Sequence, residues 1–159
     1  MIEALVTLLV LGLSAMAFAA LQIKGVTGNN GALYRSKAVQ LAAEMADRMR
    51  ANPQGAALGQ YNALTGAPGV PGCGTSTACA TPDVSDAMAQ YDYATWRATL
   101  ASSLPGGAGV VCTDTTPNDG NDAAPACTGG APATNGYLTV KVFWTEHGEA
   151  QRVWAAVRP

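Results

Sequence analysis

The stretch MIEALVTLLVLGLSAMAFAALQIK, residues 1–24, decides the fold class of this chain. Between Ala4 and Leu21 the only polar side chains are those of Thr7 and Ser14. A helix over residues 2–23 would be roughly 33 Å long at about 1.5 Å per residue, whereas the hydrocarbon core of a bilayer is about 30 Å thick. The sequence therefore predicts an amino-terminal helix that can reside in lipid.

Glu3 is the one acidic residue of this apolar segment. An ionised side chain in a membrane helix costs up to about 3 kcal/mol, less near an end of the helix, and usually marks a functional contact. Three interpretations are open: a signal peptide, a plain membrane anchor, and a helix built for lateral packing. A signal peptide would need a basic start, which is lacking, while small residues such as Gly12, Ala15 and Ala19 let other helices approach closely. We expect Glu3 to contact a positively charged partner.

The charges and the cysteines give opposite indications of the compartment. Lys24, Arg35 and Lys37 follow the apolar segment, and the positive-inside rule would then keep the rest of the chain in the cytoplasm. Four cysteines in 159 residues instead favour an oxidising compartment. A short basic leader before Met1 would reconcile the two indications, and we expect such a leader.

A second helical pattern follows the first. Residues 25–31, GVTGNNG, predict a bend or a melted turn because each glycine weakens a helix by about 1 kcal/mol. Residues 32–51 form an amphipathic pattern, with Glu44 and Arg48 placed for an ion pair. An Asn-Pro pair ends this pattern near Ala51. Its apolar positions are Ala38, Leu41, Ala42, Met45 and Met49.

Three segments carry a resemblance to a known family. Residues 1–22, MIEALVTLLVLGLSAMAFAALQ, resemble the amino-terminal helix shared by type IV pilins and type II secretion pseudopilins. Residues 34–53, YRSKAVQLAAEMADRMRANP, are similar to PilV-type minor pilins, above all in the ending MADRMRANP. Residues 92–107, DYATWRATLASSLPGG, resemble the helix and turn after the first cysteine pair of that family. The resemblance covers most of the chain, and the cysteine loops are its least constrained part.

The resemblance implies a domain organisation and a processing route. Residues 1–24 would be the membrane-spanning and filament-core helix, and residues 25–159 the periplasmic pilin domain, with its body over 52–159. A prepilin peptidase would cut a leader after a glycine and methylate the new amino terminus. In the family the glutamate is the fifth mature residue, so Glu3 implies two further mature residues before Met1. This glutamate would pair with the terminal amine of a neighbouring subunit.

The resemblance also implies a structural function. A minor pilin would wait in the inner membrane as a single-pass protein and then enter an extracellular type IV pilus at or near its tip. There it would help to initiate assembly with other minor pilins, the major pilin and a tip adhesin, and so support adhesion or motility. Two alternatives are open: a minor pseudopilin of a type II secretion system, and a membrane-anchored periplasmic binding module that stays monomeric.

The soluble part contains a second helix and a set of strands. Aromatic and aliphatic side chains recur at helical spacing from a start near Ser85 and Asp86 to Pro105, and they predict a helix with an apolar core face. These side chains are Tyr93, Trp96, Leu100 and Leu104. Strands are predicted over 109–113, 137–145 and 151–158, with a turn over 146–150. The expected fold class is α+β: the pilin fold, a long helix packed on an antiparallel sheet of three or four strands.

The four cysteines predict two disulfide-closed loops. Three connectivities exist, and we predict the sequential one, Cys73–Cys79 and Cys112–Cys127. Each bridge would stabilise a small domain by roughly 2–3 kcal/mol. A zinc site is disfavoured because the chain has one histidine and lacks paired Cys-x-x-Cys motifs.

Other site chemistry is weakly indicated. Asp114, Asp119 and Asp122 lie in the stretch DTTPNDGND and offer oxygen ligands for calcium, but the spacing differs from an EF-hand and the composition is typical of turns. We expect no cofactor. His147 falls in a turn without a catalytic partner, and the chain carries neither a nucleophile triad nor a P-loop, so we expect no enzyme. A net charge of −2 and scattered basic residues do not predict nucleic-acid binding.

Overall fold

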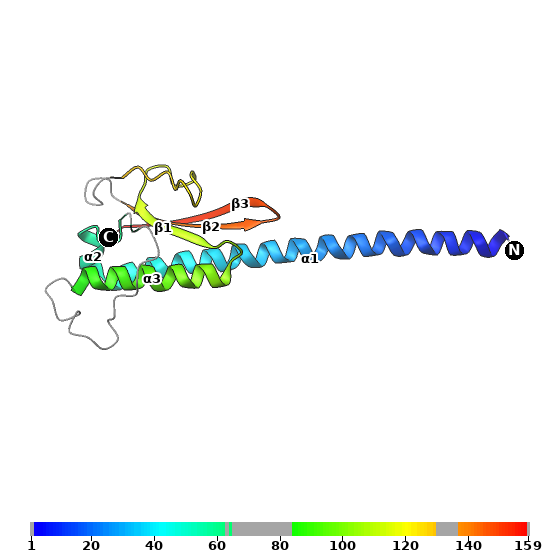
Figure 1. The fold of residues 1–159 in the computed structure, drawn as a ribbon, viewed down its shortest axis with the longest axis horizontal. Helices are drawn as coiled ribbons and strands as arrows, with labels where there is room; N and C mark the ends of the chain where they lie inside the picture. The colour runs from blue at the N-terminus through cyan, green and yellow to red at the C-terminus, as the bar shows by residue number, and fades with distance from the viewer. Residues whose placement is uncertain (1, 63, 65–83, 130–136, 159) are drawn as a thin grey trace. The chain divides into compact units, whose positions relative to one another are not determined.

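A computed structural model describes residues 2–62, 64, 84–129 and 137–158 of the chain. Its helices are α1 (Ile2–Ala51), α2 (Pro53–Ala57) and α3 (Val84–Ser103), and its strands are β1 (Ala108–Thr113), β2 (Leu138–Glu146) and β3 (Glu149–Val157) (Figure 1). The chain divides into two compact units, Met1–Tyr34 and Arg35–Pro159. A long apolar helix, a second long helix and a three-stranded antiparallel sheet confirm the predicted α+β class.

The first unit is helical throughout its described residues. Residues 25–31 belong to α1, so the predicted melted turn is wrong. Once a helix is nucleated, each added residue contributes one further backbone hydrogen bond, and the glycines weaken this propagation by only about 1 kcal/mol each. Long helical segments on both sides outweigh that penalty.

The amphipathic half of α1 lies in the second unit and begins the core. Its buried residues are Ala38, Leu41, Ala42, Met45, Ala46 and Met49, which include every predicted apolar position. The predicted ion pair is confirmed, with Arg48 Nη2 2.8 Å from Glu44 Oε1. The helix ends at Ala51 as predicted, and the Asn52 side chain accepts the Gly55 N–H at 3.1 Å to cap α2.

A buried polar network joins α1 to α3. Arg48 Nη1 lies 3.2 Å from Asp92 Oδ1, and the Tyr61 hydroxyl donates to Asp92 Oδ2 at 2.8 Å. Burial raises the pKa of Tyr61 well above its usual range, and the hydrogen bond to Asp92 adds to this effect. Tyr61 therefore remains a neutral donor that pairs with a buried carboxylate.

Trp96 connects three elements from its place on α3. It is fully buried, as the helical spacing predicts, and its Nε1–H donates to the Leu41 carbonyl of α1 at 2.8 Å. Its ring also packs against Gly109 of β1, where a Cβ atom would clash with it. The helix begins at Val84, one residue before the predicted start, so Ser85 and Asp86 lie in its first turn.

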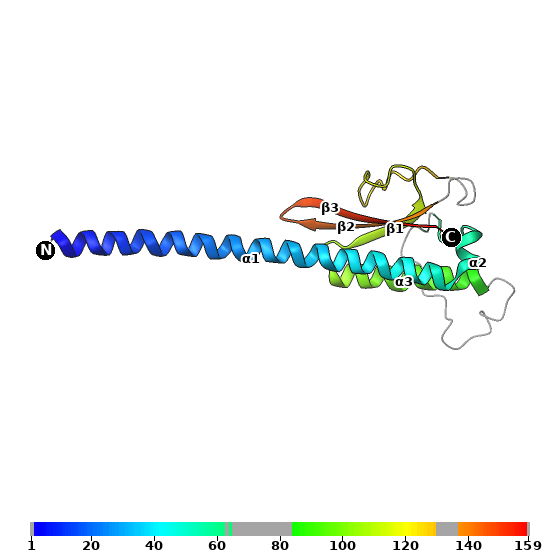
Figure 2. The ribbon, with the colours of Figure 1, turned by 180° about the vertical axis from the view of Figure 1, so that it is seen from behind.

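The sheet has the strand order β1-β2-β3, and both pairs are antiparallel. One face packs on the helical layer formed by α3 and the end of α1, and both views show the segment after β1 on the other side (Figures 1 and 2). β2 is consequently buried on both faces over most of its length. The hairpin turn is shorter than predicted, since only His147 and Gly148 separate the strands. Both have positive φ, 51° and 83°, as a two-residue type I′ turn requires.

Candidate functional site

The apolar part of α1 in the first unit is the first candidate site. Its large side chains are all exposed, from 54% for Val10 to 79% for Ile2. Among the helices that the structure describes, only α1 is long and apolar enough to cross a membrane. A surface of this length and composition is suited to lipid or to other apolar helices rather than to water.

Three hydroxyl side chains of this segment hydrogen-bond to the helix backbone. The Thr7 hydroxyl donates to the Ala4 carbonyl at 2.9 Å, the Ser14 hydroxyl to the Val10 carbonyl at 2.8 Å, and the Thr27 hydroxyl to the Ile23 carbonyl. Such bonds to the preceding turn leave no unpaired hydroxyl donor in an apolar environment. These residues therefore do not oppose burial of the helix.

Glu3 differs from these hydroxyl groups. It lies in the first turn of α1, is exposed, and makes no hydrogen bond or ion pair with any residue in the described ranges. A carboxylate taken into an apolar environment without a cation is strongly unfavourable. Glu3 is thus the position on this helix where an external cation would contribute most.

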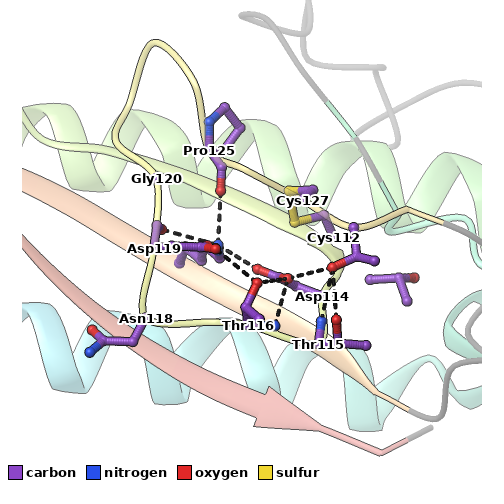
Figure 3. A network of polar contacts seen from close by, with 12 residues as sticks. Cys112, Asp114, Thr115, Thr116, Asn118, Asp119, Gly120, Pro125 and Cys127 are labelled. Carbon is purple, nitrogen blue, oxygen red and sulfur yellow. Dashed lines mark hydrogen bonds and ion pairs between the residues drawn. A yellow bond between two sulfur atoms is a disulfide. The ribbon is translucent and has the colours of Figure 1, made fainter.

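The second candidate is the loop between β1 and β2, over residues 114–129, which the structure places on the outer face of the sheet (Figure 3). Lys141 of β2 contacts this loop through its side-chain ammonium group. Its Nζ contacts Asp114 Oδ2, lies 2.9 Å from Asp119 Oδ1, and donates to the Pro125 carbonyl at 2.8 Å. The Lys141 side chain is 1% exposed and that of Asp114 is fully buried. Strand alternation in the sequence did not single out Lys141.

The electrostatics of the two aspartates follow from these contacts. Burial opposes ionisation of Asp114, but Lys141, the Thr116 N–H and the Thr128 hydroxyl all bond the carboxylate, and the net result is a pKa below the ordinary value of 3.8. Hydrogen bonds from Lys141 and from the Thr116 hydroxyl likewise lower the pKa of Asp119. Both carboxylates therefore stay ionised at neutral pH.

These contacts bear on the calcium candidates. The Lys141 ammonium contacts both Asp114 and Asp119. Asp122 does not join them and instead faces Arg97 Nη1 at 4.0 Å. Within the described ranges, no group of three His, Cys, Asp or Glu residues is arranged to hold a metal ion.

A disulfide fixes the same loop to the sheet. Cys112 of β1 is bonded to Cys127, with 6.0 Å between their Cα atoms, as predicted (Figure 3). Val110, Cys112 and Phe143 form a small apolar cluster under the loop, and Cys127 packs against it. The other predicted bridge, Cys73–Cys79, lies outside the residues that the structure describes.

Comparison with known families agrees with this architecture. Residues 20–94 match a family model described as "Tt1218-like: Type IV pilin Tt1218". The match supports a type IV pilin. It begins within the apolar helix and extends into α3, so it includes the whole amphipathic half of α1. No curated protein and no solved structure matches the chain. A pilin associates with other pilus components, and one apolar amino-terminal helix fits anchoring in a membrane.

Proposed function

We propose that this chain is a type IV pilin, a PilV-like minor subunit of the pilus that helps to initiate assembly and sits at or near the pilus tip. The observation that carries the proposal is the exposed apolar surface of α1, which has a single acid, Glu3, at its start. The family match supports the pilin part, and the ending MADRMRANP of residues 45–53 supports the minor class. Its partners are other minor pilins, the major pilin and a tip adhesin, and the assembly supports adhesion or motility.

The mechanism is a transfer of α1 between two apolar environments. Before assembly the helix lies in the inner membrane, and afterwards it packs among other pilin helices in the filament core. Apolar burial changes little in this transfer, so packing and specific polar contacts decide it. The Glu3 carboxylate supplies such a contact by pairing with the terminal amine of a neighbouring subunit.

The route to the pilus requires processing and export of the second unit. A prepilin peptidase removes a leader and methylates the new amino terminus, and the unit Arg35–Pro159 then faces the periplasm. The Cys112–Cys127 disulfide supports an oxidising compartment for this unit. In this role the chain is structural, with neither a catalytic step nor a cofactor.

Replacement of Glu3 tests the mechanism. Glu3→Ala and Glu3→Gln should leave membrane insertion intact and lower the number of surface pili by about tenfold or more, because an amine left unpaired in a dry core costs several kcal/mol. Glu3→Asp keeps the charge and should retain part of the assembly. Thr7→Val is the matched control, because it removes a hydroxyl on the same helix that bonds only to the helix's own Ala4 carbonyl. Normal pilus counts in Glu3→Ala cells would remove Glu3 from the mechanism.

The location of the chain tests the functional class. Antibodies against the second unit should detect this protein in sheared pili, in small amounts relative to the major pilin and at fibre ends. Loss of exoprotein secretion with normal pili would favour a pseudopilin, since the apolar helix suits both classes. A chain that stays in the membrane while fibres form would favour the monomeric binding module.

A further inference from the structure

A pocket in the second unit lies between α3, β1, β2 and the loop after β1. It has a volume of about 330 Å³, and we name it the Arg97 pocket. Its lining includes Tyr93, Arg97, Asp122, Ala123, Pro125 and Phe143. One cation, one acid and two aromatic rings thus share a cavity large enough for a small organic group.

Arg97 is anchored in this pocket but retains donors. Its Nη1–H donates to the Gly109 carbonyl at 2.6 Å, and its guanidinium carbon lies 6.0 Å from the centre of the Tyr93 ring. A guanidinium group carries five N–H donors, and the bond to the Gly109 carbonyl uses one of them. The side chain is 30% exposed, so solvent or a ligand reaches it. Arg97 is therefore a positioned cation with spare donors.

Asp122 is the nearest acid, and it is a weak partner. Its Oδ1 lies 4.0 Å from Arg97 Nη1, beyond hydrogen-bond distance, and its side chain is 60% exposed. The turn that carries it is closed by Asn121, whose N–H donates to the Ala124 carbonyl at 2.9 Å and whose Oδ1 accepts the Ala124 N–H at 2.8 Å. Asp122 is thus not needed to shape the turn, and an external carboxylate can take its place beside Arg97.

We propose that the Arg97 pocket binds a carboxylate carried on an aromatic or apolar stem. The planar guanidinium matches a carboxylate in a two-point hydrogen bond. Tyr93 and Phe143, 1% and 5% exposed, supply apolar walls for the stem. A single arginine next to Asp122 favours a group with one negative charge over a dianionic phosphate, which would meet stronger repulsion from that acid.

Two sources share this chemistry: a small organic acid and an acidic side chain of another protein. Both would place one carboxylate on Arg97 and an apolar stem against Phe143. The site itself does not require that the chain enters a pilus, so its test is independent of the proposed function.

The binding test uses the full chain in detergent micelles with benzoate as the probe and benzyl alcohol as its neutral counterpart. The Arg97 Nε–H signal in ¹⁵N NMR spectra should shift saturably with benzoate and not with benzyl alcohol. Arg97→Gln should weaken benzoate binding by about tenfold or more, because it removes a charge-assisted pair. Asp122→Asn should tighten binding by about two- to fivefold, since it removes a competing exposed acid. Arg50→Gln, at an exposed arginine paired with Asp47, is the matched control and should change nothing.

Two results would overturn the carboxylate site. Equal shifts with benzyl alcohol would show an apolar pocket without charge recognition. Benzoate binding that is unchanged in a folded Arg97→Gln chain, or in Asp122→Asn where Arg97→Gln does not fold, would exclude the arginine from recognition. The Asp122→Asn variant keeps the test decisive even where Arg97→Gln folds poorly, because Asp122 supports no described structure beyond its long contact with Arg97.

A photo-crosslinking amino acid at Ala123, on the pocket wall, separates the two sources in cells that make the protein. A crosslink to another protein that disappears with Arg97→Gln assigns an acidic side chain as the ligand. Benzoate binding in the purified chain without such a crosslink assigns a small organic acid.

Discussion

Replacing Lys141 by methionine should strongly destabilise the second unit. Methionine keeps most of the volume and apolar stem of lysine but removes the ammonium group. The fully buried carboxylate of Asp114 then loses its only ion-pair partner among the described residues, while Asp119 and the Pro125 carbonyl lose a shared donor. The loop over residues 114–129 would keep the Cys112–Cys127 bond as its main tie to the sheet.

The magnitude follows from the burial of the pair. Breaking a buried ion pair by removing one partner costs about 3–5 kcal/mol, because a desolvated charge is left without compensation. Asp114 keeps hydrogen bonds from the Thr116 N–H and the Thr128 hydroxyl, so the loss should lie near 3 kcal/mol. For a unit of this size, a loss of about 3 kcal/mol lowers the melting temperature by roughly 10–12 °C.

The assay is thermal unfolding of the full chain in detergent, followed by near-ultraviolet circular dichroism, which reports the tertiary packing of the second unit. The double variant Lys141→Met/Asp114→Asn removes both charges and should recover at least half of the loss, since a buried pair replaced as a whole is often nearly neutral. Lys37→Met, at a half-buried lysine without an ion pair in the described ranges, is the control and should stay within about 0.5 kcal/mol of the parent.

A Lys141→Met chain that melts within about 2 °C of the parent would refute the reasoning, because an uncompensated buried carboxylate should lower the free energy of unfolding by more than such a shift implies. Equal melting temperatures for the single and double variants would also refute it. In that case the loss would come from lysine packing and not from the charge left on Asp114.

Two further predictions concern the same loop. Both Asp114 and Asp119 have a pKa below 3.8 in the folded chain, so their stabilisation is complete above that value and is lost as the pH falls through the lowered pKa. Urea midpoints should therefore be insensitive to these groups between about pH 5 and 7 and fall below about pH 4. In Lys141→Met this fall should shrink or reverse, because protonation relieves the uncompensated Asp114 carboxylate, and an identical pH profile would contradict the assignment. Replacing Cys112 and Cys127 together by alanine opens a loop with a sequence separation of 15 and should lower the free energy of unfolding by about 3 kcal/mol in urea titrations. A loss below about 1 kcal/mol would show that the Lys141 contacts alone hold the loop.

The periodic elements of this fold were predictable because each has one dominant apolar face. The spacing of Met45 and Met49 on α1, and of Trp96 and Leu100 on α3, assigned both helices and their core faces correctly. Strand positions were right to within a few residues. The turn containing His147 was predicted, but its two-residue length was not, because positive φ is uncommon for any residue other than glycine and only Gly148 signalled it.

The role of Lys141 was not predictable from alternation alone. A lysine between Val140 and Val142 looks like the solvent face of a half-buried strand. Here the loop after β1 covers that face, and a contact between residues 119 and 141 depends on how this loop folds back. The signals available were Phe143, which shares the face with Lys141, and an acid-rich stretch next to a cysteine. Together they could have indicated a covered face and a buried lysine with acidic partners.

The melted turn predicted over residues 25–31 was wrong for a related reason. The prediction summed helix propensity residue by residue. Helix formation is cooperative, however, so a short segment of low helix propensity stays helical between long helical segments. Glu3 was found directly because a single charge in an apolar run stands out without any knowledge of tertiary contacts. Sequence thus singled out Glu3, the residue that we propose acts outside the chain, and missed Lys141, which acts inside it.

This contrast separates the two units by the kind of partner each requires. In the first unit, the hydroxyls are satisfied locally and the apolar side chains are exposed, so its carboxylate and its surface need something from outside the chain. In the second unit, the buried charges of Lys141 and Asp114 compensate one another, and the disulfide closes the loop that covers them. A change at Lys141 should therefore alter the folding of the second unit. A change at Glu3 should leave that folding intact and alter only the binding of the first unit to other subunits.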